Sequence, residues 1–569
     1  MGFLLLRVYQ LQIVDFKKYK TLAHNNTTRR SLARAPRGII YDRDGKILAS
    51  SKQSLSIVLY PAVLKQQKDL KKFAKKLSFY VDLDRHELLD LLKNIDPSTP
   101  LPIALDHDID IKTAIKIHEN ASDLPGVFVQ EEAIRYYPFA NIAAHLLGYV
   151  GQVNNNELKK SQNRALGLGD IIGKDGVENS FDEQLQGTKG ESSIAVDRYG
   201  KVLENKNFDD LEFRKPIKGK DLHLTIDYDL QKIAQDALGS NMGAVVVVKA
   251  KTGEILTLAS APSFDPNIFT KPVKNSVYQD LLNKKAFLNR ALNAYTPGSV
   301  WKPITALTAL DHEVLKTTDY YKVSGSVSLN GFQFGDWTSK EDTMNLYDAL
   351  AWSRNTFFYN VAKNLDPDWI TDLGKSFGAG KKTNIEIPGE SSGLLPSAQW
   401  KKKVYKEPWY PGNTLHFSIG QSFLLLTPLQ VARIYSAIAN DGYLPELHLV
   451  KQDEEYKLEK IDDFQLKNLE IVKKALEKCV DQGTGQAAKL PDVRIAGKTG
   501  SAEVFGYKKS THGWFASWAP VKDPEIVVVV FMEGGGHGGT VAAPIAKMLY
   551  RAYFDKIKAN ETKSITINS

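Results

Sequence analysis

The sequence predicts an α+β protein in which a C-terminal domain carries an antiparallel sheet with helices packed on it. Residues 242–248 and 254–259 form two apolar runs separated by a short turn, and residues 526–531 form a third run much later in the chain. Short runs rich in valine and isoleucine are typical of buried strands. The residues between them have mostly helical patterns, so this sheet is expected to assemble from both ends of its domain.

The N-terminal residues 1–14 are apolar, but the run is shorter than the roughly 20 residues that a helix needs to cross a bilayer. The run lacks a basic stretch before it and a small-residue cleavage site after it, so it is not a complete signal peptide. Two interpretations remain open for this segment. It is either the outer half of a membrane helix or an amphipathic helix that docks on the body of the protein.

Residues 26–215 form a first large region of mixed texture. Residues 67–77 and 85–92 are predicted to form charged helices. The adjacent carboxylates Glu131 and Glu132 are interpreted as surface groups, because nothing in the sequence fixes a second carboxylate at a catalytic separation. We find no catalytic motif in this region and no internal repeat in the chain.

A polar linker that contains proline and glycine leads into a second domain, which we assign to residues 216–560. This domain is expected to begin with a strand over residues 222–226 and a helix over 229–238. It is expected to close with a helix over residues 542–553. Residues 561–569 are expected to be a loose tail.

Composition narrows the function classes. A chain of 569 residues is long enough for three or four domain-sized units, and its 43% hydrophobic and 25% charged content is that of a globular protein. The net charge of +8 is spread along the chain, which argues against a nucleic-acid partner. The single cysteine, Cys479, excludes an internal disulfide and a cysteine-rich metal site.

The only Ser-x-x-Lys pattern in the chain places Ser299 three residues before Lys302. A proline–glycine pair before it favours a turn. Because Pro303 is tolerated only near a helix start, Ser299 is expected to open a helix. The Lys302 amine would then lie beside the Ser299 hydroxyl and act as its base. The alternative is a serine helix cap followed by a solvated lysine.

A serine acyl-enzyme of this type also needs a later Ser-x-Asn and then a Lys-Thr-Gly. Residues 353–355 (Ser-Arg-Asn) supply the first and precede an amphipathic helix expected over residues 356–365. Residues 498–500 (Lys-Thr-Gly) supply the second and follow residues 493–497, which are expected to be a strand ending in glycine. The three motifs therefore occur in the order that this chemistry requires.

Chance copies of the same patterns occur at residues 161–163, 251–253 and 328–330. The first copy lies in a polar loop before the Ser-x-x-Lys motif. The second lies between two apolar runs and is predicted to be a hairpin turn, and the third is predicted to be another turn. Their contexts favour the copies at 353–355 and 498–500 as the functional ones.

With these motifs in this order, the sequence resembles the class B, monofunctional penicillin-binding proteins. Further blocks carry the resemblance: residues 37–45 (RGIIYDRDG), 143–151 (AAHLLGYVG), 176–178, 185–187, 222–231, 385–396, 420–421 and 427–430. Within class B, the short glycine-rich segment after residue 500 is most similar to the elongation type, penicillin-binding protein 2. Residues 178–182 and 197–200 also suit the division type, which stays open as an alternative.

The resemblance implies an elongated, membrane-anchored protein. Residues 1–25 would be the end of a transmembrane anchor with its juxtamembrane segment, and residues 26–215 a non-catalytic, dimerisation-like pedestal with an inserted head. Residues 216–560 would be a penicillin-binding, transpeptidase domain similar to the serine β-lactamases. The chain would cross the inner (cytoplasmic) membrane once, with its catalytic domain on the periplasmic side.

The implied activity is that of a serine-type D-Ala-D-Ala transpeptidase, which cross-links peptidoglycan stem peptides during cell-wall elongation and has a possible carboxypeptidase side activity. Ser299 would be the nucleophile, Lys302 its base and Ser353 the proton relay to the leaving nitrogen. Asn355 would position the substrate. Lys498 and Thr499 would lie on an edge strand and hold the substrate's terminal carboxylate. The backbone N–H groups of Ser299 and Ser501 would form the oxyanion hole, and Gly500 is also implied to bind the substrate. A third alternative is a β-lactam sensor or scaffold that keeps this fold without turnover.

The resemblance also implies the partners. They are peptidoglycan stem peptides, β-lactams that acylate Ser299, a membrane glycosyltransferase of the RodA type, and the scaffold MreC, which would bind the pedestal. Some elongation-type relatives hold zinc between the first two motifs. Residues 303–352 offer only His312 and no cysteine, so we expect no metal, and no cofactor is implied.

Overall fold

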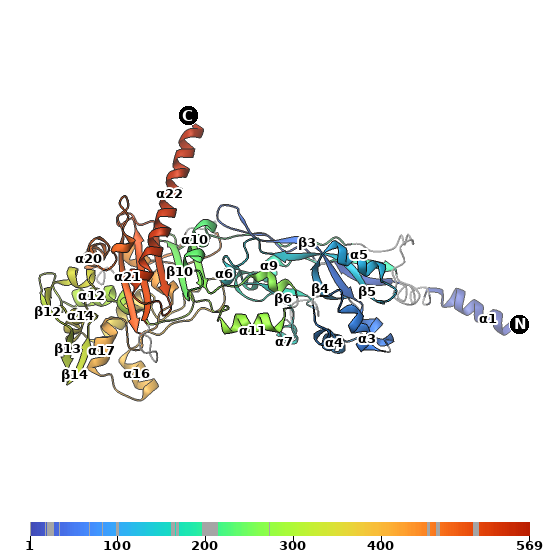
Figure 1. Ribbon diagram of the computed structural model, residues 1–569, viewed down its shortest axis with the longest axis horizontal. Helices are drawn as coiled ribbons and strands as arrows, with labels where there is room; N and C mark the ends of the chain where they lie inside the picture. The colour runs from blue at the N-terminus through green and yellow to red at the C-terminus, as the bar shows by residue number, and fades with distance from the viewer. Residues whose placement is uncertain are drawn as a thin grey trace.

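The computed structural model describes residues 2–17, 19, 28–33, 35–67, 69–81, 83–97, 102–160, 166, 170–195, 214–271, 273–451, 456–461, 467–503 and 511–568. The molecule is elongated, with helix α1 (Gly2–Tyr9) at one end and the main antiparallel sheet toward the other (Figure 1). A one-turn π-helix, Gln10–Val14, follows α1. Within these ranges no helix is both long enough and apolar enough to cross a bilayer.

The N-terminal region, which we call the pedestal, is organised around strand β3 (Ile47–Leu59). This strand pairs antiparallel with β2 (Ile40–Tyr41), β4 (Ile103–Ile109) and β5 (Val127–Tyr136). The strand expected over residues 222–226 is β9 (Leu222–His223), and it pairs in parallel with β2. The segment that leads into the second domain is therefore hydrogen-bonded to the pedestal sheet.

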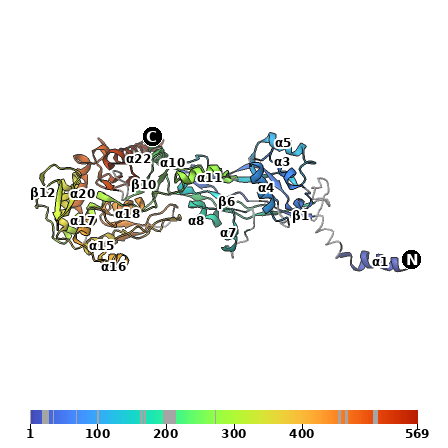
Figure 2. The same cartoon turned by 60° about the horizontal axis from the view of Figure 1, so that its bottom comes forward.

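The head of the pedestal consists of helices α3 (Leu70–Leu77), α4 (Arg85–Asn94) and α5 (Ile111–Glu119), which lie at the end far from the main sheet (Figure 2). The two charged helices expected here are confirmed as α3 and α4. Asp69 caps α3 by accepting a hydrogen bond from the Lys72 amide. Apolar side chains from all three helices and from β3 form a separate core cluster beneath them.

Smaller elements complete the pedestal. They are β1 (Thr28–Ala33), β6 (Val150–Gln152), β7 (Ile171–Gly173), β8 (Gly190–Ala195), the 3-10 helix Pro61–Gln66, α6 (Ala144–Leu147), α7 (Asn155–Lys160), α8 (Gly176–Ser180) and α9 (Asp182–Leu185). The expectation that Glu132 lies on the surface is wrong. Its side chain is 7% exposed and pairs with His107, because Glu132 on β5 and His107 on β4 meet over Ser56 of β3, the strand between them.

The second domain contains a five-stranded antiparallel sheet in the order β11-β10-β20-β19-β18. Its strands are β10 (Gly243–Lys249), β11 (Ile255–Ala261), β18 (Ala496–Glu503), β19 (Thr511–Ala519) and β20 (Ile526–Met532). The first two strands form a hairpin and the last three come from the C-terminal end, so the predicted assembly from both ends is confirmed. Strand β18 is at the edge of the sheet.

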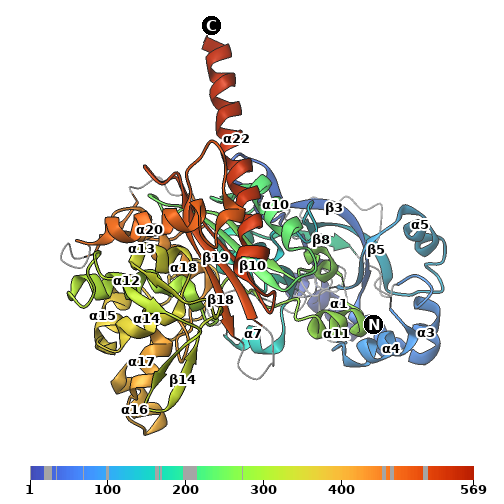
Figure 3. The ribbon, with the colours of Figure 1, turned by 60° about the vertical axis from the view of Figure 1, so that its left-hand side comes forward.

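Both faces of this sheet are buried. Val245 and Val528 belong to one core cluster with helices α10 (Tyr228–Leu238) and α22 (Ala543–Asn568). Their neighbours Val246 and Val529 point to the opposite face, into the larger cluster with α18 (Pro428–Ala439). Figure 3 shows α10 and α22 on one side of the sheet and α12 to α17 gathered on the other.

The helical part contains α11 (Asn275–Asn283), α12 (Lys302–Asp311), α13 (Leu346–Ala351), α14 (Asn355–Ala362), α15 (Pro367–Ser376), α16 (Ala398–Tyr405), α17 (Pro411–Ser418), α20 (Leu469–Asp481), α21 (Gly538–Val541) and the 3-10 helices Pro266–Thr270, Gly298–Trp301 (η4) and Gln486–Ala488. Its short strands are β12 (Tyr321–Val323), β13 (Ser326–Leu329), β14 (Phe332–Gly335), β15 (Asp342–Met344), β16 (Tyr443–Pro445) and β17 (Leu458–Lys460). The turns predicted at residues 251–253 and 328–330 are confirmed as the β10–β11 and β13–β14 hairpins.

Two elements differ from expectation. The strand expected over residues 493–497 instead begins at Ala496 and runs through the Lys-Thr-Gly motif to Glu503, because pairing with β19 continues along it. The position of Lys498 and Thr499 on an edge strand, which the resemblance implied, is confirmed. The closing helix α22 continues to Asn568, so the residues expected to be a loose tail are helical, and they extend away from the body (Figures 1 and 3).

Candidate active site

The Ser-x-x-Lys motif lies where the chain passes from η4 into α12. Ser299 is in η4, and Lys302 is the first residue of α12, whose residues are all buried. Gly298 has a φ of 57°, a conformation that side chains other than glycine rarely adopt. A Cβ on Gly298 would lie 3.0 Å from the Cβ of Ala502 on β18. The glycine therefore lets the turn that carries Ser299 pack against the edge strand.

The Ser-x-Asn motif connects α13 to α14. Ser353 has a φ of 58°, a strained value for a serine, and its side chain is buried. The Lys302 Nζ donates hydrogen bonds of 2.7 Å to the Ser353 carbonyl and 2.7 Å to the Asn355 Oδ1, and lies 3.4 Å from the Ser353 Oγ. The alternative of a solvated lysine is excluded, because Lys302 is 0% exposed.

The Lys-Thr-Gly motif lies on the edge strand β18. Lys498 is fully buried and donates to the Thr499 carbonyl at 3.0 Å. The Thr499 hydroxyl is held at 2.6 Å from the hydroxyl of Thr484, which lies in the turn after α20. The Ser501 Oγ lies 3.3 Å from the Nδ1 of His537. The strand thus presents two hydroxyls, each with a side-chain neighbour.

The two lysines have different electrostatic environments. Burial lowers the pKa of Lys302 well below its ordinary value of 10.5, and the nearby charge of Lys498 lowers it further. Burial lowers the pKa of Lys498 to about 8. The shift of Lys302 is in the direction that a general base needs, whereas Lys498 remains mostly protonated at neutral pH. The site therefore contains one lysine whose charge is strongly disfavoured and a second lysine that keeps its charge more readily.

These groups surround a cleft of about 390 Å³. Of the residues predicted from the sequence, the cleft is lined by Ser299, Ser353, Asn355, Thr499 and Ser501. Lys302 and Lys498 lie buried behind it, and Gly500 packs beneath the first motif, where a Cβ would lie 3.0 Å from the Pro297 carbonyl oxygen. The structure thus brings all three motifs to one place.

The cleft also contains residues that the motifs did not identify: Trp337, Gly483, Thr484, Gln486, Ala487, His537, Gly539 and Thr540. Thr484 lies between two glycines and His537 lies in a glycine-rich run, so a polar side chain flanked by glycines was the available signal. Trp337 follows a short hairpin and carries no such signal. Of the chance copies, residues 161–163 lie outside the described residues.

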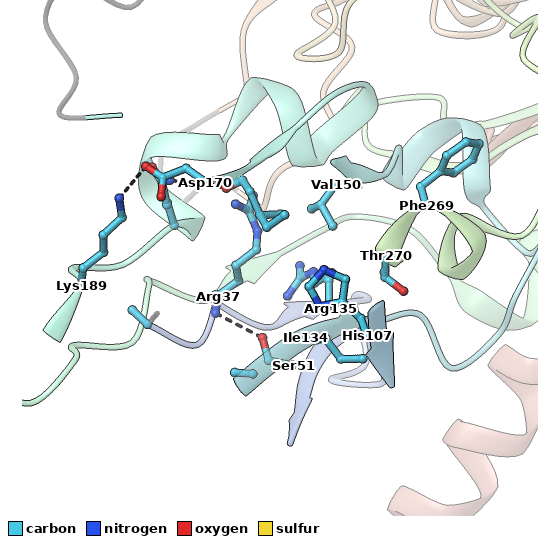
Figure 4. Close-up of a pocket in the computed structure, with 14 residues that line it drawn as sticks. Arg37, Ser51, His107, Ile134, Arg135, Val150, Asp170, Lys189, Phe269 and Thr270 are labelled. Carbon is cyan, nitrogen blue, oxygen red and sulfur yellow. Dashed lines mark hydrogen bonds and ion pairs between the residues drawn. The ribbon is translucent and has the colours of Figure 1, made fainter. Parts of the chain in front are cut away.

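A second cavity, of about 70 Å³, lies where the pedestal meets the second domain, since Phe269 and Thr270 also line it (Figure 4). Figure 4 shows Arg37, Arg135 and His107 beside it and the Lys189–Asp170 ion pair at its edge. The two arginines both pair with Glu178, which is 0% exposed. The main charges around this cavity are thus paired within the chain. All three motifs lie in the other cleft, which is therefore the candidate active site.

No cluster of three or more side chains able to ligate a metal occurs in the part of the chain that the structure describes. The segment between the first two motifs is instead held by an ion pair. The Arg354 Nε lies 3.1 Å from the Asp336 Oδ2, and both side chains are buried.

Comparisons with known proteins agree with this geometry. Residues 243–551 match the family model described as "Penicillin binding protein transpeptidase domain", and residues 32–224 match "Penicillin-binding Protein dimerisation domain". A curated relative, the peptidoglycan D,D-transpeptidase MrdA of Haemophilus influenzae, is 32% identical over 596 residues. The match covers 98% of this chain and 90% of that protein.

Solved structures share the architecture. PBP2 from Helicobacter pylori, in a complex with MreC, is similar with a TM-score of 0.81 and 26% identity, covering 92% of this chain and 99% of that chain. A chain in a structure described as "Structural coordination of polymerization and crosslinking by a peptidoglycan synthase complex" has a TM-score of 0.73 and 29% identity. That match covers 97% of this chain and 96% of the other.

Proposed function

This chain belongs to the class B penicillin-binding proteins, and from that premise we propose that it is a peptidoglycan D,D-transpeptidase of the elongation type. The observation that carries the proposal is the placement of Lys302. Its Nζ is buried, deprived of solvent and hydrogen-bonded to the Ser-x-Asn motif in the cleft that Ser299 lines. A serine becomes a nucleophile when an adjacent neutral base takes its proton, and Lys302 is a buried lysine three residues along the chain from Ser299.

In the acylation step, the Ser299 Oγ gives its proton to the Lys302 Nζ and attacks the carbonyl carbon between two D-alanines of a stem peptide. The tetrahedral oxyanion is stabilised by the backbone N–H groups of Ser299 and Ser501. The C–N bond then breaks, the leaving nitrogen receives a proton through the Ser353 Oγ, and the terminal D-alanine departs. Asn355 positions the peptide.

In the second step, an amine of a neighbouring stem peptide attacks the acyl-enzyme carbonyl and Ser299 is released with its proton restored. The Lys498 charge and the Thr499 hydroxyl bind the carboxylate of the donor's terminal D-alanine before it leaves. A β-lactam occupies the same position, and its opened ring stays attached to Ser299. The backbone of Gly500 completes the edge strand along which the peptide lies.

Labelling tests the proposal. The purified chain is expected to form one covalent penicillin adduct, detected by mass spectrometry on the peptide that carries Ser299. Ser299→Ala should form none while its thermal unfolding stays as cooperative as that of the wild type. An adduct on Ser353 would show that the wrong serine was chosen, and an unlabelled wild type would contradict the proposed function.

The elongation assignment rests on the MrdA relatives and on the coverage of nearly the whole chain by PBP2 structures. Depletion in the native host separates it from the division type. Round cells are the expected result, and filaments would contradict it. We place the chain at the inner membrane with its catalytic domain in the periplasm, with residues 1–25 as anchor segment, 26–215 as pedestal, 216–560 as catalytic domain and 561–569 as terminal extension.

The head of the pedestal is the proposed binding site for an MreC-type scaffold. The support is the MreC complex of the Helicobacter pylori relative and the apolar side chains exposed on the head, with Phe79 78%, Ile111 63% and Ile115 51% exposed. The double variant Ile111→Asp and Ile115→Asp should lose binding to purified MreC of the same host. Ile217→Asp, at a position that is 65% exposed outside the head, is the control that should bind normally.

A RodA-type glycosyltransferase is the second proposed partner, supported by the match to a peptidoglycan synthase complex. The purified chain alone should not polymerise lipid-linked disaccharide. Polymerisation by the chain without any partner would contradict this division of labour.

A further inference from the structure

The chemistry proposed above assigns no role to the buried ion pair between Arg354 and Asp336, which lies at the Ser-x-Asn motif. The Arg354 Nε lies 3.1 Å from the Asp336 Oδ2, with the two side chains 2% and 0% exposed. The Arg354 Nη2 donates to the carbonyl oxygens of Ser324 at 3.1 Å and Lys340 at 2.9 Å. One guanidinium thus ties the β13–β14 hairpin at both of its ends to the residue in the middle of the Ser-x-Asn motif.

The Asp336 carboxylate also contacts the residue that follows the Ser-x-Asn motif. The Asp336 Oδ2 accepts hydrogen bonds from the Thr356 amide at 2.9 Å and from the Thr356 hydroxyl at 2.8 Å. Asn355 lies between the two anchored residues. Its Nδ2 donates to the Gly335 carbonyl at 3.4 Å, and its Oδ1 accepts from the Lys302 Nζ at 2.7 Å. The orientation of the Asn355 amide therefore depends on where Asp336 and Arg354 hold the hairpin.

We propose that the Arg354–Asp336 ion pair is a positioning device for the acylation reaction. It fixes the Asn355 amide toward Lys302 and places two opposite charges near the base. This inference rests on the proposed function of Ser299 and Lys302. Neither Arg354 nor Asp336 lines the cleft, so both residues act through Asn355 and Lys302 rather than on the substrate.

The charged groups that face Lys302 come from three elements. Lys498 on β18 and Arg354 before α14 lower the pKa of Lys302 in addition to burial, and Asp336 after β14 raises it. Removing only Asp336 should therefore lower the pKa of Lys302, and removing only Arg354 should raise it. An ion pair with a purely structural role would not predict shifts of opposite sign.

The test measures the second-order rate of Ser299 acylation by a fluorescent penicillin over a pH series, in the full chain. The variants are Asp336→Asn, Arg354→Met, and the double variant Arg354→Met with Asp336→Leu, which keeps side-chain volume without leaving a buried charge. The matched control is the exposed ion pair of Lys284 and Asp280, four residues apart on and just after α11, changed to Lys284→Met with Asp280→Asn.

The midpoint of the pH profile should move down in Asp336→Asn and up in Arg354→Met, by about one pH unit or less. The midpoint of the double variant should lie between those of the two single variants. Its rate should stay about tenfold slower or more, because the Asn355 amide is no longer held. The control should match the wild type in both midpoint and rate. Thermal unfolding reports whether each variant is folded, and the double variant carries the test if a single variant is not.

Single-variant midpoints that stay unchanged or move in the same direction, together with a wild-type rate in the double variant, would overturn the inference. That outcome differs from failure of the proposed function, in which wild-type Ser299 would not be labelled at all. Arg354→Lys gives a further readout, because it keeps the charge but cannot bind both hairpin carbonyls and the carboxylate at once. It should keep the midpoint and lose rate.

Discussion

Lys302 and Lys498 both lie behind the cleft, and their proposed roles follow from the effect of burial on the charge of each. Lys302 has no ion-pair partner among its hydrogen bonds, which go to a carbonyl and an amide oxygen. Its Nζ also lies 5.3 Å from the centre of the Phe358 ring, and the side chain is fully buried. An ammonium is costly to keep there, so the neutral amine is favoured. Lys498 lies on the edge strand, where it keeps its proton up to a pKa of about 8.

Lys302→Arg is expected to abolish acylation of Ser299, because an arginine keeps its proton at any workable pH and cannot act as a base. In the wild type, the acylation rate should rise with pH through a group that titrates well below 10.5, since only the deprotonated Lys302 is active. Time-resolved labelling with fluorescent penicillin measures both effects. A rate that climbs only near the ordinary lysine pKa would show that Lys302 is an electrostatic support and that the base lies elsewhere.

At the residue scale, the motifs identified the site residues that interact with near neighbours in the sequence. Ser299 and Lys302 are three residues apart, so helical geometry alone brought them together. Thr484 and Asp336 could not be found this way, because each acts on a residue from a distant segment: Thr484 on Thr499, and Asp336 on Arg354. The glycines on either side of Thr484 mark its position but not its partner, and Asp336 has no such signal, so only the packed fold shows which residue each one contacts.

At the scale of elements, the site depends on a 3-10 turn packed against an edge strand. Strand β18 has the sequence AGKTGSAE, which has low intrinsic strand propensity. Its pairing with β19 forms it, and its small residues let η4 approach closely. The strand was predicted to stop at Gly497 because the prediction used the intrinsic propensity of these residues. Tertiary pairing with β19, which the sequence does not show, is what forms the strand. Helix α22 was also predicted too short. Its outer turns carry no apolar face that would have identified them as helical from the sequence.

Gly298→Ala should separate the effect of close packing from that of backbone strain. The substitution places a side chain at a φ of 57° and 3.0 Å from the Ala502 Cβ, so η4 must move away from β18. We expect a loss of about 1 kcal/mol in the free energy of unfolding from the backbone alone, and acylation of Ser299 slowed about tenfold or more. Chemical denaturation and penicillin labelling measure the two quantities.

Gly239→Ala is the matched control for this element. Gly239 follows α10 with a φ of 55°, but the nearest atom to its added Cβ is the Asp236 carbonyl oxygen at 3.7 Å. It should lose stability through its backbone alone, because φ 55° with ψ −125° is a conformation open to glycine and disfavoured for alanine, and it should acylate at the wild-type rate. Equal acylation rates in the two variants would show that contact between η4 and β18 does not position the nucleophile.

At the scale of the whole molecule, the predicted α+β fold with a pedestal and a transpeptidase domain is confirmed by the two family models and the PBP2 structures. Charged residues in the pedestal were harder to predict. Glu178 accepts from Arg37 and Arg135 in full burial, and burial alone would raise its pKa, but the two arginines hold it below its ordinary value. Such ionic cores consist of residues that a sequence pattern assigns to the surface.

The junction between the two domains contains another cluster of charges. Lys556, on α22, lies 2.7 Å from the Asp44 Oδ2 in the turn after β2 and 2.7 Å from the Asp227 Oδ2 that caps α10. Burial would lower the pKa of Lys556, but its hydrogen bonds to Asp227 and Asp44 outweigh burial and raise it. Because a raised lysine pKa adds stability that is complete below the unfolded value of 10.5, this bridge is fully formed at neutral pH.

Lys556→Met should loosen the angle between pedestal and catalytic domain while costing about 1 kcal/mol or less in stability, since the side chain is partly exposed and screened. Electron spin resonance between labels on cysteines placed at Lys112 and Lys402 measures the distance distribution across the junction; the native cysteine is buried. The variant should broaden that distribution, and high salt should broaden the wild type toward it.

Lys558→Met is the control, because Lys558 pairs at 2.8 Å with Asp492 inside the catalytic domain. Distributions that are the same in both variants and in the wild type would show that apolar and backbone contacts alone set the angle.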